Sequence, residues 1–173
     1  VKDSQKESNV EWVVMAVMNA KTGEIIGYSS TPSFDPNIRN LTNYMDPLIS
    51  YAYEPGSTMK TFSYMCAIES GRYDGEATFM SGSKTYVSAL DEKDTVTIKD
   101  WNGKGWGKIN YDYGYAMSSN IGVATLLDEV ITKKQLNDCY KKYGFGKQTG
   151  IELSGELEGD ISFKYKSEIA SAS

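Results

Sequence analysis

The chain has 173 residues, of which 40% are hydrophobic and 24% charged, so it is long and apolar enough to fold as one domain of ordinary size. Its formal charge of −5 argues against nucleic acid as a partner. Because it has no histidine and only 2 cysteines, a Ser-His-Asp site is excluded and a zinc site has too few soft ligands.

A β-hairpin is predicted near the N-terminus, after a polar lead-in that does not resemble a signal peptide. The apolar run 12–18 is followed by a Lys-Thr-Gly turn at residues 21–23 and by a second apolar run at residues 24–29. Two such runs about a turn are typical of antiparallel strands, and we expect the hairpin to be buried on at least one side. Residues 31–43, with two prolines and several asparagines, form an irregular connector.

A helix is predicted after the Pro-Gly turn at residues 55–56. Met59, Phe62 and Cys66 recur at helical spacing, and Gly71 is a plausible end of the helix. The start of this helix carries the most informative residues of the chain.

Ser57 and Lys60 lie one helical turn apart at that start. Serine needs an adjacent base to act as a nucleophile, and without histidine Lys60 is the obvious substitute. The helix dipole and partial burial would both lower the pKa of this lysine and favour the neutral form that accepts a proton. Taken alone, Ser-x-x-Lys is more often a helix cap with a solvated lysine. A second copy at residues 81–84 has no helical period behind it and is interpreted as a loop.

Short strands or extended loops, then helices, are predicted in the second half of the chain. A glycine-rich loop at residues 102–107 fails the phosphate-binding pattern, because no Gly-Lys-Ser/Thr follows at the required spacing. The extended segments are 78–80, 84–87 and 95–98, and the helices are 111–117, 120–130 and 133–143, with residues 165–173 as a further polar segment of helical character.

Ser118 and Asn120 lie in a turn between two predicted helices, so their side chains can project from it. A hydroxyl there can relay a proton to a leaving group, and the amide can hold a substrate carbonyl and the lysine at once. The alternative is an N-cap for the helix that starts at Ile121. A Ser-x-x-Lys at a helix start and a Ser-x-Asn in a turn between helices are much less probable together by chance than either motif alone.

Cys66 and Cys139 each lie among apolar residues of a predicted helix. Buried free thiols are the default interpretation, and a bridge between the two cysteines is left open.

These motifs resemble those of the penicillin-binding protein transpeptidases, which share Ser-x-x-Lys, Ser-x-Asn and Lys-Thr/Ser-Gly elements. The similarity extends from Val10 over nearly the whole chain and is specific. Segments 53–60, 100–107 and 143–156 look like those of class B, division-type enzymes of Gram-positive bacteria, and segment 19–25 resembles the family's first strand pair.

The resemblance implies that Ser57 is the acylated nucleophile and Lys60 its base, with Ser118 and Asn120 as proton relay and substrate-orienting pair. Trp101 would border the substrate groove, although a packed loop aromatic is an equal alternative. The implied reaction is peptidoglycan D,D-transpeptidation: the serine attacks the D-Ala-D-Ala bond of a stem peptide and passes the acyl group to an amine. β-Lactams mimic that dipeptide and acylate the serine.

The implied fold is α+β, of the penicillin-binding and serine β-lactamase type. A sheet hairpin at residues 10–30 would pack with a mainly helical subdomain at residues 44–173. No cofactor or metal is expected. The resemblance further implies a place at the outer face of the cytoplasmic membrane, an N-terminal anchor that this chain lacks, and cell-wall synthesis and division proteins as partners.

The third family element is missing after the Ser-x-Asn motif. The Lys-Thr-Gly at residues 21–23 precedes the serine, and residues 147–150 are interrupted by a glutamine. We therefore expect a partial transpeptidase domain without its C-terminal strands. Since one oxyanion donor of the family comes from the missing strand, and the loss of one donor costs on the order of 10²–10³ in rate, this chain alone should be weakly active or inactive.

Two other function classes remain open at this point. A β-lactam sensor or a serine β-lactamase would share Ser-x-x-Lys, and fast turnover of the acyl-enzyme would indicate the β-lactamase. A non-catalytic cell-wall assembly module would explain a lack of labelling by penicillin.

Overall fold

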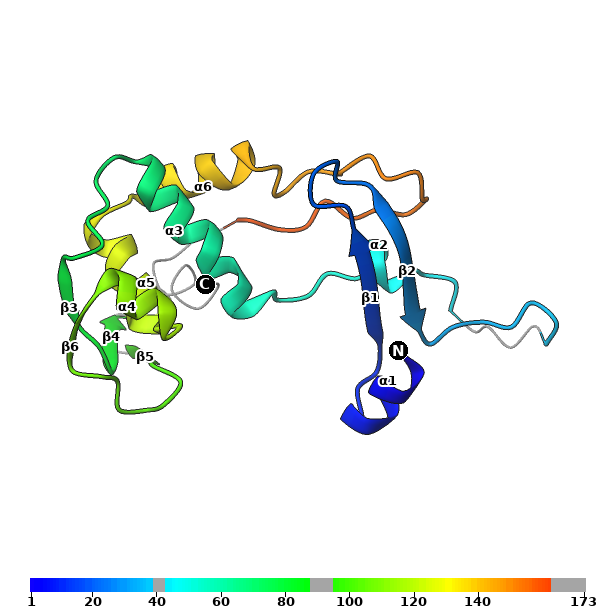
Figure 1. Cartoon of the computed structure of the whole chain (residues 1–173), viewed down its shortest axis with the longest axis horizontal. Helices are drawn as coiled ribbons and strands as arrows, with labels where there is room; N and C mark the ends of the chain where they lie inside the picture. The colour runs from blue at the N-terminus through cyan, green and yellow to red at the C-terminus, as the bar shows by residue number, and fades with distance from the viewer. Residues whose placement is uncertain (39–42, 88–94, 163–173) are drawn as a thin grey trace. The chain divides into compact units, whose positions relative to one another are not determined.

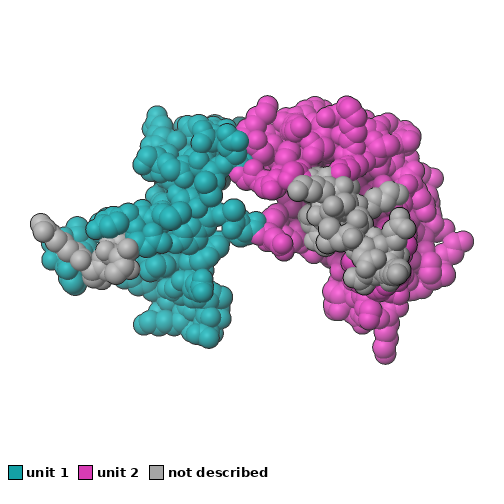
Figure 2. Space-filling view, turned by 180° about the vertical axis from the view of Figure 1, so that it is seen from behind, with its two compact units in different colours: residues 1–53, 148–158 teal, residues 54–147, 159–173 magenta. Residues whose placement is uncertain are grey.

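The structure, a computed structural model, describes residues 1–38, 43–87 and 95–162. Its elements belong to two units, shown in different colours in Figure 2. Unit 1 comprises Val1–Tyr53 and Gln148–Glu158, and unit 2 comprises Glu54–Lys147 and the chain from Gly159 onward. The segment 148–158, assigned from the sequence to the helical subdomain, is thus grouped with the hairpin. The predicted segment 165–173 lies outside the described residues.

Unit 1 contains the predicted hairpin, which is confirmed (Figure 1). Strand β1 (Val13–Met18) pairs antiparallel with β2 (Ile25–Thr31). The turn closes because the Asn19 side chain accepts hydrogen bonds from the backbone N–H groups of residues 21 and 22. Two helices accompany the strands: α1 (Lys2–Ser8), which the sequence did not predict, and α2 (Pro47–Ser50), capped by Asp46.

The prediction that this hairpin is buried on at least one side is wrong for the described residues. Both faces expose large apolar side chains, such as Met15 at 54% and Ile26 at 71%. The physical reason is that the sheet has only two strands within the described residues and α2 is a single turn, so only the end of the hairpin around Thr31 is buried and the rest of both faces stays exposed. Within unit 1, the segment 148–158 lies against α2, where Ser50 Oγ donates to Gly155 O over 2.9 Å and Leu157 N donates to Ile49 O over 2.9 Å.

Unit 2 carries the four helices predicted within the described residues, and these four form (Figure 1). A 3₁₀ turn, η1 (Gly56–Thr58), runs directly into α3 (Met59–Glu69). They are followed by α4 (Tyr111–Ala116), α5 (Asn120–Glu129) and α6 (Lys133–Lys142). Side chains cap the last three at their N-termini: Asn110 for α4, Ser119 for α5, and Thr132 in a capping box with Gln135 for α6.

The short strands of unit 2 form two ribbons. Strand β3 (Thr78–Met80) pairs with β6 (Lys108–Asn110), and β4 (Ser83–Val87) pairs with β5 (Thr95–Lys99), both antiparallel. Three of these strands were predicted, and β6 was not. The second Ser-x-x-Lys copy is not helical: its first two residues lie in a turn and its last two open β4.

The glycine-rich loop is held against that turn. Ser81 Oγ accepts a hydrogen bond from Trp106 N over 2.6 Å and donates to Gly107 O over 2.8 Å. A Cβ at Gly105 would lie 2.3 Å from Gly82 N, so the two backbones meet where only glycine fits.

The hydrophobic core of unit 2 lies between α3, α5 and α6, with β3 at its side. Ala67, Val123 and Leu126 are fully buried, and Leu136 is 1% exposed. Phe79 of β3 completes the packing against Gly114 and Gly122. This core fixes α3, and therefore the residues at its N-terminus, relative to α5. Within the described ranges no helix is long and apolar enough to cross a bilayer.

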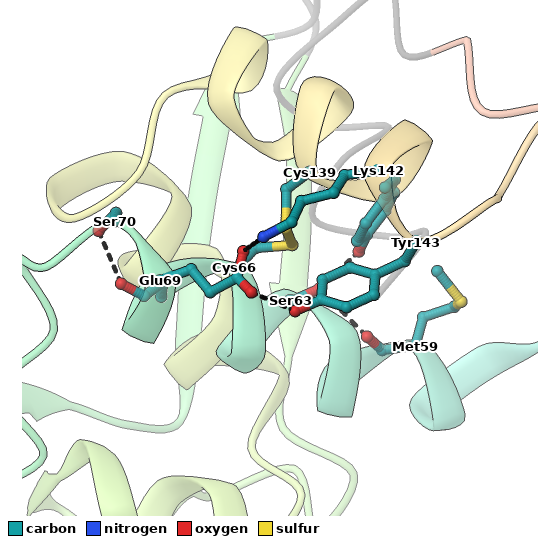
Figure 3. The surroundings of a disulfide bond; sticks show 10 residues. Met59, Ser63, Cys66, Glu69, Ser70, Cys139, Lys142 and Tyr143 are labelled. Carbon is teal, nitrogen blue, oxygen red and sulfur yellow. Dashed lines mark hydrogen bonds and ion pairs between the residues drawn. A yellow bond between two sulfur atoms is a disulfide. The ribbon is translucent and has the colours of Figure 1, made fainter.

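The default interpretation of free thiols is wrong. Cys66 of α3 and Cys139 of α6 form a disulfide, with Cα atoms 5.9 Å apart (Figure 3). The two helices pack face to face, which brings together cysteines separated by 73 residues in the sequence. On the exposed side of the same contact, Lys142 Nζ binds Glu69 Oε2 over 2.7 Å, and the Tyr143 hydroxyl donates to the same carboxylate.

Candidate active site

Lys60 is the centre of the candidate site. It belongs to the first turn of α3 and is only 3% exposed. Its Nζ donates to Ser118 O over 2.8 Å, to Ser118 Oγ over 3.1 Å and to Asn120 Oδ1 over 2.6 Å. Burial lowers the pKa of Lys60, as the sequence predicted, while the negative charge of Asp100 acts in the opposite direction.

Ser57 lies in the 3₁₀ turn that precedes α3, and its side chain is exposed. It does not cap the helix. Thr58 Oγ1 instead donates to Pro55 O over 2.6 Å, and Gly56 has a φ of +60°, a conformation that suits glycine. In the described part of the chain no hydrogen bond joins the Ser57 hydroxyl to Lys60. The sequence thus places the serine and the lysine one turn apart, and the structure leaves the hydroxyl open to solvent.

The Ser-x-Asn motif forms the junction between α4 and α5. Ser118 has a φ of +54°, which is uncommon for a residue with a side chain. Ser119 is the N-cap of α5, because its Oγ accepts a hydrogen bond from Gly122 N over 2.9 Å. The N-cap alternative therefore holds for Ser119, while Ser118 and Asn120 on either side of it face Lys60.

The orientation of the Asn120 amide is fixed from both ends. Its Nδ2 donates to Lys99 O over 2.7 Å, which leaves Oδ1 for the lysine at 2.6 Å. An amide nitrogen carries two N–H groups, so one remains for a further acceptor.

Asp100 is a member of the site to which the sequence pattern gave no role. It is 2% exposed, and its carboxylate accepts hydrogen bonds from Ser119 Oγ (2.8 Å), Ile121 N (3.1 Å) and Gly82 N (2.7 Å). The usable signal was weak: an aspartate two residues after the predicted strand 95–98 and directly before a tryptophan. Only the fold shows that this carboxylate faces the start of α5.

Trp101 is 68% exposed, yet its indole is held in place. Its Nε1 donates to Met117 O over 2.9 Å, and its ring lies edge-on to Trp106 with centroids 5.9 Å apart. Since Met117 directly precedes Ser118, the exposed indole is anchored next to the Ser-x-Asn motif.

The two sequences that resemble the third family element belong to turns. Residues 21–23 form the turn of the β1–β2 hairpin. The second sequence, residues 147–150, is held by the Glu156 carboxylate, which accepts hydrogen bonds from Thr149 N, Thr149 Oγ1 and Gly150 N. That local carboxylate occupies the donors. Within the described residues, no cluster of three or more His, Cys, Asp or Glu side chains offers a metal site.

Comparison with known proteins identifies the family. A family model described as the penicillin binding protein transpeptidase domain matches residues 13–173. The chain therefore belongs to the penicillin-binding protein transpeptidase family.

Similar proteins carry related names. The chain is 31% identical over 162 residues to stage V sporulation protein D of Bacillus subtilis, covering 91% of this chain and 24% of the relative. It is 28% identical to the peptidoglycan D,D-transpeptidase MrdA of Acinetobacter baumannii, covering 90% of this chain and 25% of that protein. It is 27% identical to the peptidoglycan D,D-transpeptidase FtsI of Buchnera aphidicola, and the match covers 92% of this chain and 27% of that protein. The chain thus spans about a quarter of the length of these relatives.

Solved structures show the same fold. The crystal structure of a peptidoglycan glycosyltransferase from Burkholderia ambifaria matches with a TM-score of 0.77 and 21% identity, over 98% of this chain and 49% of that one. The transpeptidase domain of penicillin-binding protein 3 from Burkholderia pseudomallei matches with a TM-score of 0.74 and 22% identity, over 98% of this chain and 46% of that one. The predicted fold class is confirmed.

Proposed function

We propose that this chain supplies the nucleophile, the base and the proton relay of a peptidoglycan D,D-transpeptidase that cross-links stem peptides through a serine acyl-enzyme and is acylated by β-lactams. One observation carries the proposal. A buried lysine, one turn after an exposed Ser57, has its Nζ within 3.1 Å of both Ser118 and Asn120. Family membership and relatives named as D,D-transpeptidases support it.

In the proposed reaction Ser57 Oγ attacks the carbonyl carbon of the D-Ala-D-Ala peptide bond while neutral Lys60 takes the hydroxyl proton. The C–N bond then breaks. The departing amine takes the Ser118 hydroxyl proton, and Lys60 returns a proton to Ser118 over their 3.1 Å contact. The products are D-alanine, neutral Lys60 and an ester on Ser57. A neighbouring amine attacks that ester, loses a proton to Lys60 and leaves as the cross-linked amide, and the proton returns to Ser57.

The other residues orient the substrate in this proposal. The Asn120 N–H that does not bind Lys99 donates to a substrate carbonyl. Trp101 borders the substrate groove with its anchored, exposed indole.

The biological setting is part of the proposal as well. The whole protein acts at the outer face of the cytoplasmic membrane, held there by an N-terminal anchor, together with cell-wall synthesis and division proteins. Since this chain spans about half of the solved structures that it matches, we expect it to be weakly active or inactive by itself.

Labelling by a fluorescent penicillin tests the proposal on three proteins: this chain, the complete transpeptidase domain that contains it, and that domain with Ser57→Ala. We expect labelling of the complete domain alone. Labelling that survives Ser57→Ala would refute the assignment of the nucleophile, and robust labelling of the chain alone would refute its incompleteness. Prompt release of the label would indicate a β-lactamase instead. No labelling of any form would favour a binding module.

A further inference from the structure

Asp100 connects three segments of unit 2 at a buried point. Its Oδ1 accepts from Ser119 Oγ at 2.8 Å and from Ile121 N at 3.1 Å, and its Oδ2 accepts from Gly82 N at 2.7 Å. The side chain is 2% exposed. A buried carboxylate is costly unless it is hydrogen-bonded, and these three donors, together with the positive end of the α5 dipole, satisfy it.

The two neighbours of Asp100 bind the same turn. Lys99 O accepts a hydrogen bond from Asn120 Nδ2 over 2.7 Å, and Trp101 Nε1 donates to Met117 O over 2.9 Å. Three consecutive residues, 99–101, therefore hold both flanks of Ser118.

Ser118 is the residue whose position matters for the lysine. Both its carbonyl and its hydroxyl lie within 3.1 Å of Lys60 Nζ, and its φ is +54°. A side-chain-bearing residue stays in this conformation only where its surroundings determine it. The backbone bonds that end α4, from Ser118 N to Tyr115 O over 2.9 Å and from Ser119 N to Gly114 O over 2.8 Å, set this conformation, and the bonds from residues 99–101 hold the turn in place beside Lys60.

We propose that Asp100 is a positioning residue of the active site, whose carboxylate holds the Ser118–Asn120 turn against Lys60 and whose charge acts on that lysine. The proposal rests on the proposed function, since it assigns Asp100 to the same reaction. Asp100 does not touch the reacting atoms and acts through Ser119, Ile121 and the electrostatic field at Lys60.

The negative charge of Asp100 leads to a prediction that a purely structural role of this residue would not make. Lys60 faces two neutral residues, Ser118 and Asn120, and Asp100 is the carboxylate whose charge raises its pKa against the effect of burial. Removal of that charge lowers the pKa of Lys60. Because acylation requires the neutral lysine, the rate rises with pH through this pKa, and its midpoint moves to lower pH when the charge is removed.

The test measures acylation by a fluorescent penicillin against pH in the complete transpeptidase domain that contains this chain. Asp100→Asn should slow acylation about tenfold to a hundredfold, the scale of a misplaced catalytic group, and shift the midpoint to lower pH. Ser119→Ala removes one donor to Asp100 and keeps the charge, so it should slow acylation with the midpoint unmoved. The control is Asp138→Asn, the same change at an exposed aspartate paired with Lys134 on α6, which should alter neither quantity.

The proposal is overturned if Asp100→Asn keeps the wild-type rate, or if its rate falls while the midpoint stays in place. If Asp100→Asn loses its native near-ultraviolet circular dichroism, that variant is misfolded and the test uses Ser119→Ala instead. A wild-type acylation rate for Ser119→Ala then overturns the proposal. Failure of the proposed function looks different: the wild-type domain is then unlabelled, or Ser57→Ala is labelled. In that case the Cε chemical shift of Lys60 followed against pH still tests Asp100, since an equal Lys60 pKa in wild type and Asp100→Asn overturns the inference.

Discussion

Reduction of the Cys66–Cys139 disulfide should destabilise unit 2 substantially. The bridge joins α3 to α6 across 73 residues of sequence. In the chain-entropy model, closing a loop of this length removes about 15 cal/mol/K from the unfolded ensemble, which corresponds to about 4 kcal/mol at 25 °C. Small domains have total stabilities of about 5–15 kcal/mol, so the expected loss is a large share of the whole.

The assay is urea unfolding of the wild-type chain with and without a thiol reductant, followed by far-ultraviolet circular dichroism. Reduction is preferable to substitution because it leaves the packing atoms in place, and a thiol count under denaturing conditions verifies each state. The control is the Cys66→Ala/Cys139→Ala variant, whose unfolding midpoint should ignore the reductant. Equal stabilities for the oxidised and reduced wild type would refute the reasoning, as would two free thiols in the untreated protein.

Three further predictions concern the site and its supporting loop. Lys60→Arg keeps the positive charge but cannot give up a proton, so acylation of the complete domain by a fluorescent penicillin should fall by about 10²–10⁴, and a rate near wild type would exclude Lys60 as the base. Because burial lowers the pKa of Lys60, the wild-type rate should rise with pH around a midpoint below the ordinary lysine value of about 10.4; a rate independent of pH below that value would contradict this. Gly105→Ala and Gly103→Ala have matched φ values of +72° and +71°, but only at Gly105 does the new Cβ meet backbone, 2.3 Å from Gly82 N. Thermal unfolding should show a loss of about 1–2 kcal/mol at Gly103 and a clearly larger one at Gly105, and equal losses would mean that the close approach is relieved at no cost.

Local sequence patterns predicted most of the secondary structure because each element carries its own signals. The apolar runs around Asn19 and the helical spacing of Met59, Phe62 and Cys66 are signals of this kind. The caps that the structure shows, Asn110, Ser119 and Thr132, act over the same short range. The Ser-x-x-Lys and Ser-x-Asn motifs could be paired from sequence for a related reason. The first motif needs only a helix start and the second only a turn between helices, and neighbouring residues in the sequence predict both features.

The disulfide, the exposure of the hairpin and the place of Asp100 were not revealed by the sequence, because they depend on which elements pack together. The disulfide requires the facing of α3 and α6, and the exposure of the hairpin depends on how few strands lie beside it. Asp100 is the clearest case, because its three donors come from residues 82, 119 and 121. Nothing next to Asp100 in sequence distinguishes a buried anchor from a solvated aspartate.

The hydrogen bonds of Lys60 suggest how its protonation state governs the proposed reaction. An ammonium group has three donors, and Ser118 O, Ser118 Oγ and Asn120 Oδ1 accept all of them. A neutral amine keeps two donors and gains a lone pair, so one contact must reverse direction. Neither a carbonyl nor the amide oxygen can donate, which leaves the Ser118 hydroxyl as the group that turns towards the lone pair.

That reversal links deprotonation of Lys60 to the role proposed for Ser118. With neutral Lys60 the Ser118 proton already points at the amine, so the proton that Lys60 later returns follows a hydrogen bond that exists before the substrate arrives. The same bond occupies the lone pair that Ser57 needs, and the Ser57 hydroxyl is exposed without a bond to Lys60 in the described structure. Formation of the acyl-enzyme therefore requires Ser118 to release Lys60 before Ser57 gives up its proton. Ser118 then turns towards the leaving nitrogen, which becomes able to accept a proton once the attack of Ser57 has converted the planar amide into a tetrahedral intermediate.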